Sequence, residues 1–231
     1  MKKLLCIALL FFLPKGIAQT ITPVYGHWKF DSLAEGNSEQ DMQKAQAFLG
    51  NLSMHFYPDG NYESTVMGKG ESGTFKQEGK LLLFTVTETS KTYQYELVSI
   101  ETETIVINMT KFLVKLRRIT SDTTTAVLQN KWKLTSMGGN DADDDDNAVF
   151  DAPTVPKGSG LLLDRNGSYT FTLGTIKETG YWDYRVKKDD SKVLILNTNG
   201  KVKYWPLVTY TPTELSVVVN TGGQKYVFVP I

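Results

Sequence analysis

The sequence is poor in the side chains that build disulfide, metal and redox sites. Its 231 residues include one cysteine, Cys6, and two histidines, His27 and His55. A single cysteine forms no disulfide within the chain, so stability has to come from burial of an apolar core. With so few nitrogen and sulfur ligands available, we expect neither a bound metal ion nor a cofactor.

The sequence also lacks an excess of charge of either sign. It has 25 basic and 25 acidic residues, with 41% of all residues hydrophobic and 22% charged. Binding to nucleic acid depends on a surplus of positive charge, so we expect no nucleic-acid partner. The balance is that of a packed, water-soluble protein rather than a disordered or multispan membrane chain.

Only one long apolar run is evident, and it lies at the amino terminus. Lys2 and Lys3 precede the run Leu4–Leu13, and a Gly-Ile-Ala triplet ending at Ala18 follows it. This order is typical of a secretory signal, and the run is about half of the roughly 20 apolar residues that span a bilayer. We therefore expect a signal peptide at residues 1–18, no membrane span, and export to the periplasm or out of the cell.

Two parts of the sequence repeat one pattern. Residues 54–75 align without a gap onto residues 161–182, and Trp28 and Trp132 each open a copy in a Trp-Lys-apolar triplet. The identical pairs in the aligned stretch are Gly60/Gly167, Tyr62/Tyr169, Thr65/Thr172, Glu71/Glu178 and Gly73/Gly180. We predict two homologous domains, residues 19–119 and 128–231, joined by a short polar linker at residues 120–127.

Within each copy the hydrophobic periodicity is two residues. Residues 61–66 alternate in polarity after the Asp59-Gly60 pair, and Asn166-Gly167 marks the same turn in the second copy. Such pairs between alternating runs are strong hairpin signals. About eight short strands follow one another in each copy, which is enough to close a barrel. The sequence predicts an all-β protein of two tandem eight-stranded antiparallel up-and-down barrels.

Helix is expected only at residues 38–49, where apolar residues recur at helical spacing. The matching connection of the second copy, residues 138–158, is rich in Asp, Pro and Gly and predicts a loop. Its acidic run at residues 141–147 does not fit an EF-hand, because Asp146 stands where that loop needs glycine. We favour a solvated acidic loop over a calcium site.

This pattern resembles the lipocalin-like domains of exported Bacteroidota proteins. Gly26-His27-Trp28 matches the Gly-x-Trp signature of lipocalins, and Arg117 or Arg118 in the last strand matches the arginine that packs over the Trp ring in that family. The second copy departs from it, with Asn130 in place of the glycine, and Lys225 but no arginine in its last strand. The resemblance implies small barrels that are often associated with apolar ligands.

Aromatic residues gather in the second copy and are the candidate ligand-binding residues. A barrel lined by them is suited to hold an apolar molecule, although large inward side chains also simply fill such a barrel. Trp28 and Trp132 are instead assigned to closing the barrel bases. The candidate ligand-binding residues are Phe171, Trp182, Tyr184, Tyr204 and Trp205.

The sequence therefore predicts an exported, non-enzymatic binding protein that carries or sequesters a small apolar ligand. The alternative is an envelope protein-interaction or scaffold module, whose filled barrels present residues 31–51 and 138–158 to a protein partner. A hydrolase or isomerase using Glu71 and Glu178 is a third possibility, but duplication alone explains why these glutamates recur. Neither histidine lies in a nucleophile motif, so no catalytic residue is assigned.

Overall fold

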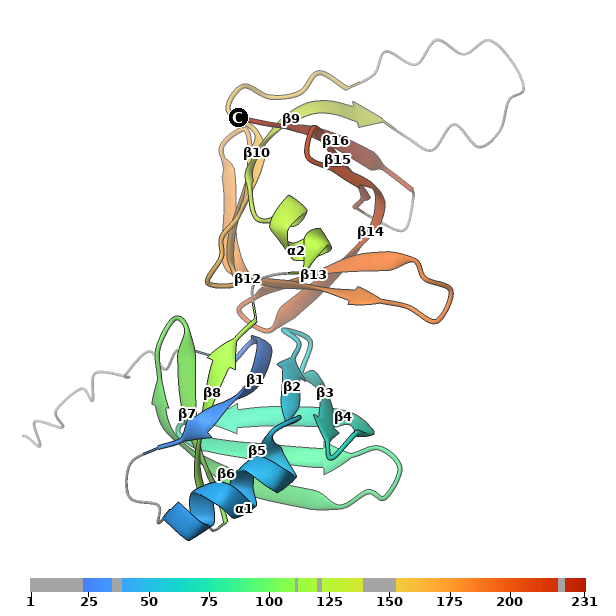
Figure 1. The fold of residues 1–231 in the computed structure, drawn as a ribbon. Helices are drawn as coiled ribbons and strands as arrows, with labels where there is room; N and C mark the ends of the chain where they lie inside the picture. Colours follow the sequence, from blue (N-terminus) through green and yellow to red (C-terminus); the bar gives the residue numbers. More distant parts are fainter. Residues whose placement is uncertain (1–22, 35–38, 111, 120–121, 139–152, 220–222) are drawn as a thin grey trace, which may run out of the picture.

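The structure is a computed structural model that describes residues 23–34, 39–110, 112–119, 122–138, 153–219 and 223–231. It consists of two closed antiparallel barrels of eight strands each, stacked one on the other (Figure 1). The strands of each barrel follow one another in sequence order around the sheet, so both are up-and-down barrels. This confirms the predicted fold. The expected signal peptide, residues 1–18, lies outside the described residues.

Barrel 1 is built from strands β1 to β8, and barrel 2 from strands β9 to β16. The bounds in barrel 1 are β1 (Gly26–Leu33), β2 (Ser53–Phe56), β3 (Asn61–Val66), β4 (Lys69–Glu78), β5 (Leu81–Val86), β6 (Thr92–Ile100), β7 (Thr104–Met109) and β8 (Phe112–Arg118). Those in barrel 2 are β9 (Lys131–Gly138), β10 (Gly160–Leu163), β11 (Ser168–Leu173), β12 (Ile176–Val186), β13 (Lys192–Thr198), β14 (Lys201–Thr211), β15 (Glu214–Val218) and β16 (Lys225–Pro230).

Matching glycines show that the two barrels share one design. Gly60 and Gly167 close the predicted turns with φ of 82° and 81°, a backbone conformation that favours glycine. Gly73 and Gly180 lie where two strands and a tyrosine ring approach closely. A Cβ atom at either position would overlap a carbonyl oxygen of the neighbouring strand and press on the ring of Tyr62 or Tyr169. The repeated glycines therefore mark repeated backbone geometry.

The first tryptophan of each copy closes a barrel end in the same way. The buried indole of Trp28 donates a hydrogen bond to the carbonyl oxygen of Val24 at 2.7 Å, and that of Trp132 donates to Leu128 at 3.1 Å. In both cases the acceptor lies four residues earlier and is itself buried. The structural role expected for the two tryptophans is consistent with this arrangement.

Two helices accompany the barrels. Helix α1 (Glu39–Leu49) was expected, and it packs on barrel 1 through the buried Ala45 while Met42 and Phe48 remain exposed (Figure 1). Helix α2 (Thr123–Leu128) falls in the segment predicted to be a polar linker. Asp122 caps it by accepting a hydrogen bond from the Thr125 amide at 2.8 Å. This helix delivers Leu128 into the base of barrel 2.

Side chains fill both barrel interiors. Inward-facing residues of all the strands form one buried cluster in each barrel, and aromatic rings contact one another across it. Buried side chains thus occupy the interior of each barrel. Within the described residues, no helix has the length and apolar character needed to cross a bilayer.

Candidate functional site

Arg118 is the arginine that covers the first tryptophan. Its guanidinium lies 4.1 Å from the centroid of the Trp28 ring, and it donates hydrogen bonds to the carbonyl oxygens of Thr102 at 2.7 Å and Tyr25 at 2.9 Å. Burial lowers the pKa of this arginine. Of the two arginines that the resemblance allowed, Arg118 fills the position, whereas Arg117 forms an exposed ion pair with Asp31.

The predicted aromatic residues do not form one group. Phe171 and Trp205 meet edge to face in the interior of barrel 2, with ring centroids 5.3 Å apart. Trp182 is buried in the same cluster, and its indole donates a hydrogen bond to the Asp164 carbonyl oxygen at 3.0 Å. The interior thus brings three of the five predicted residues together.

The other two aromatic residues take part in contacts elsewhere. The hydroxyl of the partly buried Tyr184 donates to the Asp122 carboxylate at 2.8 Å. Tyr204 is 51% exposed, and its hydroxyl donates to Asp59 of barrel 1 at 3.2 Å. Because side chains alternate across a strand, Tyr204 and its neighbour Trp205 point to opposite faces of the sheet. Tyr204 therefore belongs to the contact between barrels.

The repeated glutamates make separate contacts, one in each barrel. Glu71 of barrel 1 accepts a hydrogen bond from the Tyr62 hydroxyl at 2.7 Å. Glu178 of barrel 2 forms an ion pair with Lys203, with an Nζ to Oε2 distance of 2.6 Å. Each carboxylate thus takes part in a contact within its own barrel.

The turn of barrel 1 around Asp59 docks on the outer face of barrel 2. The Asp59 side chain is only 1% exposed and accepts two hydrogen bonds from Arg185, at 3.0 and 3.2 Å. The side chain of Asn197 also donates to the carbonyl oxygen of Pro58 at 2.6 Å. A paired, buried carboxylate surrounded by donors fixes the relative position of the two barrels.

A second set of contacts lies beside this turn. The His55 Nε2 atom lies 2.7 Å from Oδ2 of Asp183, and the rings of Tyr25 and Tyr181 meet edge to face at 5.3 Å. On β12, Tyr181, Asp183 and Arg185 stand two residues apart and so share one face of the strand. This face of β12 is the surface that receives barrel 1.

Planar side chains form a column across the contact. The ring of His27 is parallel to that of His55 at 4.9 Å, and His55 stacks on Tyr57 at 4.0 Å. The guanidinium of Arg185 covers Tyr57, with its carbon atom 4.0 Å from the ring centroid. Cation–π attraction of this kind strengthens when water is excluded. Three members of the column come from barrel 1 and one from barrel 2.

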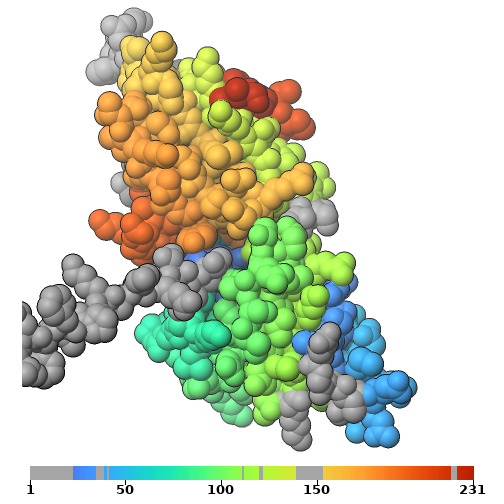
Figure 2. Space-filling view, turned by 90° about the vertical axis from the view of Figure 1, so that its left-hand side faces the viewer, coloured from blue at the N-terminus to red at the C-terminus, as the bar shows by residue number. Residues whose placement is uncertain are grey.

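A cleft of about 330 Å³ opens beside this column. Figure 2 shows the two lobes meeting along a broad waist, and residues of both barrels line the cleft. Barrel 1 contributes His27, Glu63 and Arg118, among others. Barrel 2 contributes Trp182 and Tyr184. The cleft thus offers hydrogen-bond donors, acceptors and aromatic surface within one small volume.

The polar groups of the cleft are held in defined positions. Glu63 accepts a hydrogen bond from the Tyr57 hydroxyl at 3.1 Å, and His27 Nε2 lies 2.7 Å from Ser53 Oγ. Burial, and next the neighbouring His55, lower the pKa of His27, so its neutral form is favoured. The described residues contain no group of three or more His, Cys, Asp and Glu side chains arranged to hold a metal ion.

Comparison with known proteins finds no matching family and no curated protein of similar sequence. The assignment of a site therefore depends on the geometry of this chain. Most residues that form the cleft were not predicted as site residues, and of the predicted five only Trp182 and Tyr184 line it.

Proposed function

We propose that the chain is an exported, non-enzymatic binding protein that holds a small polar ligand in the cleft between its two barrels. The observation that carries this proposal is a preformed cleft with walls from both barrels, beside barrel interiors that side chains occupy. A volume of about 330 Å³ lies within the range of small-molecule sites. The direct contacts between barrels keep the opposing walls in register.

The proposal is tested by NMR titration with amino acids, monosaccharides and dicarboxylates. We expect at least one compound to give saturable shifts confined to the cleft, including the indole of Trp182. Val186→Trp places a bulky ring in the cleft wall and should abolish these shifts, while Val208→Trp, at an exposed valine outside the cleft, should not. Shifts confined to the surroundings of Trp205, or unchanged in Val186→Trp, would contradict the proposal.

The absence of catalysis is part of the proposal and has its own test. The hydrogen bond between His27 and Ser53 is a contact that a serine nucleophile would also make. We expect hydrolysis of p-nitrophenyl acetate by the wild-type chain to be no faster than by Ser53→Ala. A clear loss of turnover in the variant would show that this pair performs chemistry.

An apolar ligand inside barrel 2 is the second candidate function. One observation favours it: the indole nitrogen of Trp205 is buried in the interior without a hydrogen-bond partner among the described residues. A ligand with a polar end would satisfy this nitrogen, but it would have to displace packed side chains. Saturable quenching of tryptophan fluorescence by retinol, lost in Trp205→Phe but not in Val186→Trp, would favour this candidate over the cleft.

The scaffold alternative depends on exposed loop surfaces. Helix α1 lies within residues 31–51 and exposes Met42 and Phe48, which a protein partner would cover. Of residues 138–158, positions 139–152 lie outside the described residues. Interaction with an envelope protein therefore stays a prediction.

A further inference from the structure

A second depression lies on the outer face of barrel 2, separate from the cleft. It measures about 860 Å³ and shares no lining residue with the cleft. Its floor is the outer face of β9, β10 and β11, and residues 155–159 form one wall. We call it the β9–β10 groove. Its residues come from barrel 2 alone, so its shape does not depend on how the barrels dock.

The wall of the β9–β10 groove is anchored by a buried serine. The Ser159 hydroxyl donates to the Pro156 carbonyl oxygen at 2.7 Å and accepts a hydrogen bond from the Gly174 amide at 3.1 Å. The backbone carbonyl oxygen of Ser159 accepts a hydrogen bond from the Leu134 amide, also at 3.1 Å. These bonds tie the wall to β9 and to the turn after β11. The groove is therefore built into the barrel surface.

The charged side chains that line the groove are all basic. Four lysines line it, and no aspartate or glutamate side chain does. None of the four forms an ion pair with a carboxylate of the described residues. The lysines are Lys131, Lys133, Lys157 and Lys177. A concave surface lined by charge of one sign concentrates ligands of the opposite sign.

Apolar surface lies among these lysines. Val155, Pro156 and Leu162 line the groove, and so does Ile231, which is 72% exposed. Exposed apolar side chains gathered in a groove favour the binding of hydrocarbon. A ligand that satisfies both parts of this surface carries an anionic group and an apolar chain in one molecule.

Barrel 1 shows that the fold itself does not require these residues. In the aligned copy, His27 and Gly70 stand at the positions of Lys131 and Lys177, and His55 stands at the position of Leu162. His55 contacts Asp183 of barrel 2 and His27 stacks on His55, whereas the matching face of barrel 2 carries the groove. The basic and apolar character of the groove thus distinguishes the second barrel from the first.

We propose that the β9–β10 groove binds a single-chain anionic amphiphile of the fatty acid type. The carboxylate lies among the lysines, and the hydrocarbon chain lies against Val155, Pro156 and Leu162. This site is independent of the polar-ligand site between the barrels. A protein with both sites binds two chemically different ligands.

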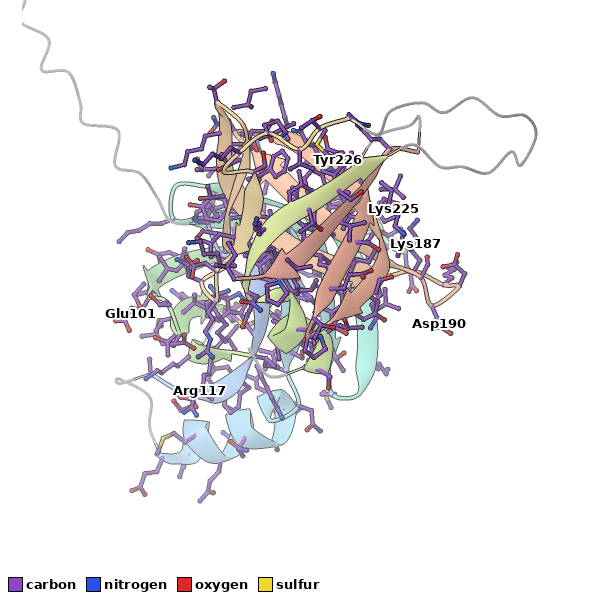
Figure 3. All side chains as sticks on the ribbon, turned by 90° about the horizontal axis from the view of Figure 1, so that it is seen from above. Glu101, Arg117, Lys187, Asp190, Lys225 and Tyr226 are labelled. Atoms are coloured by element: carbon purple, nitrogen blue, oxygen red, sulfur yellow. The ribbon has the colours of Figure 1, made fainter. Side chains whose placement is uncertain are left out.

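The test is calorimetric titration of the full chain with laurate below its micelle concentration. We expect one saturable site. Neutralising three groove lysines in K131Q/K133Q/K177Q should weaken the affinity about tenfold or more, because charge-assisted contacts to the carboxylate are lost. The matched control K187Q/K188Q/K201Q removes three lysines that do not line the groove and should change the affinity by less than about twofold. In Figure 3, Lys187 lies on a hairpin that projects away from the barrel.

Two further measurements separate the contribution of the ligand's charge to its affinity from that of its hydrocarbon chain. Dodecanol has a chain of the same length without the charge and should bind at least about tenfold more weakly than laurate. Leu162→Gln should weaken laurate binding while circular dichroism stays unchanged. Absence of laurate binding would overturn the proposal. Equal losses in both triple variants, equal binding of dodecanol, or loss of laurate binding in Val186→Trp would also overturn it.

Discussion

The carboxylate of Asp59 in barrel 1 accepts both hydrogen bonds of a two-pronged contact from the guanidinium of Arg185 in barrel 2. The Asp59 side chain is almost completely buried at this point, and Arg185 also covers the ring of Tyr57. A charge buried in this way is stable only while its partner remains in place. The pair therefore connects the position of one barrel to that of the other.

Asp59→Asn should weaken the contact between the barrels. Arg185 then loses its charged partner while it stays mostly buried, and we expect a loss of about 2 kcal/mol in the free energy of unfolding. Urea denaturation measures this loss. Asp190→Asn, at an exposed turn of barrel 2, is the control and should change stability by less than about 0.5 kcal/mol. Equal stability of the two variants would show that the Asp59 contact does not hold the barrels together.

Stability should fall as the medium becomes acidic, in part because of His27. Burial and the nearby His55 lower the pKa of His27 in the folded chain, and Asp183, Asp122 and Glu63 only partly oppose this. His27 binds a proton more readily in the unfolded chain than in the folded chain. The stability that neutral His27 contributes is therefore fully present above the ordinary histidine pKa. It is lost as the pH falls below the ordinary histidine pKa of about 6.5.

The measurement compares urea midpoints of the wild type and His27→Gln at about pH 8 and about pH 5.5, on either side of that value. The variant should show a smaller difference between the two midpoints, because it removes one group whose protonation favours unfolding. If the difference between the two urea midpoints is the same in the variant as in the wild type, groups other than His27 cause the loss of stability at acidic pH.

Gly73→Ala and Gly180→Ala should both destabilise the chain. In each, the new methyl group would overlap a carbonyl oxygen of the adjacent strand, so the backbone has to shift. We expect a loss of about 3 kcal/mol for each substitution. Gly70→Ala is the matched control on β4, because a Cβ there meets no atom within 4 Å and needs no left-handed backbone. Thermal denaturation measures these losses. A loss of stability in Gly70→Ala as large as in Gly73→Ala and Gly180→Ala would contradict this account.

Arg118→Ala should lower the free energy of unfolding more than Arg117→Ala does, although the two positions are adjacent. Arg118 loses its contact with the Trp28 ring and two hydrogen bonds to carbonyl oxygens, for a total of about 2 kcal/mol. Arg117 loses only an exposed ion pair with Asp31, worth less than about 0.5 kcal/mol. Chemical denaturation of the two variants gives the comparison. Equal losses would mean that Arg118 does not close the end of barrel 1.

The barrels were predictable because their determinants are local and repeated. The signals are Trp28 and Trp132, the Asp59-Gly60 and Asn166-Gly167 turns, and the alternating runs beside these turns, all of which can be read without knowledge of distant contacts. Helix α2 was missed because residues 123–125 are three threonines, which have low helix propensity. The one available signal was Asp122 as a helix cap.

The cleft was not predictable from the same pattern. His55, Asp183 and Arg185 occupy outward positions of their strands, where the alternation indicates only polar residues facing solvent. Whether such residues face water or a second barrel depends on how the barrels dock. The size of the aromatic residues does not by itself predict a shared site. Tyr204 lies on the outer face of β14, and because side chains alternate along a strand, the neighbouring Trp205 faces the interior.

Residual dipolar couplings measured on both barrels test the central claim most directly, because the cleft exists only while the barrels are docked. The contacts of Asp59 with Arg185 and of His55 with Asp183 predict that one alignment tensor fits the amides of both barrels. In Asp59→Asn, the two barrels should begin to align separately. Two tensors of different magnitude in the wild-type chain would show that the barrels move independently, and would contradict a binding site between them.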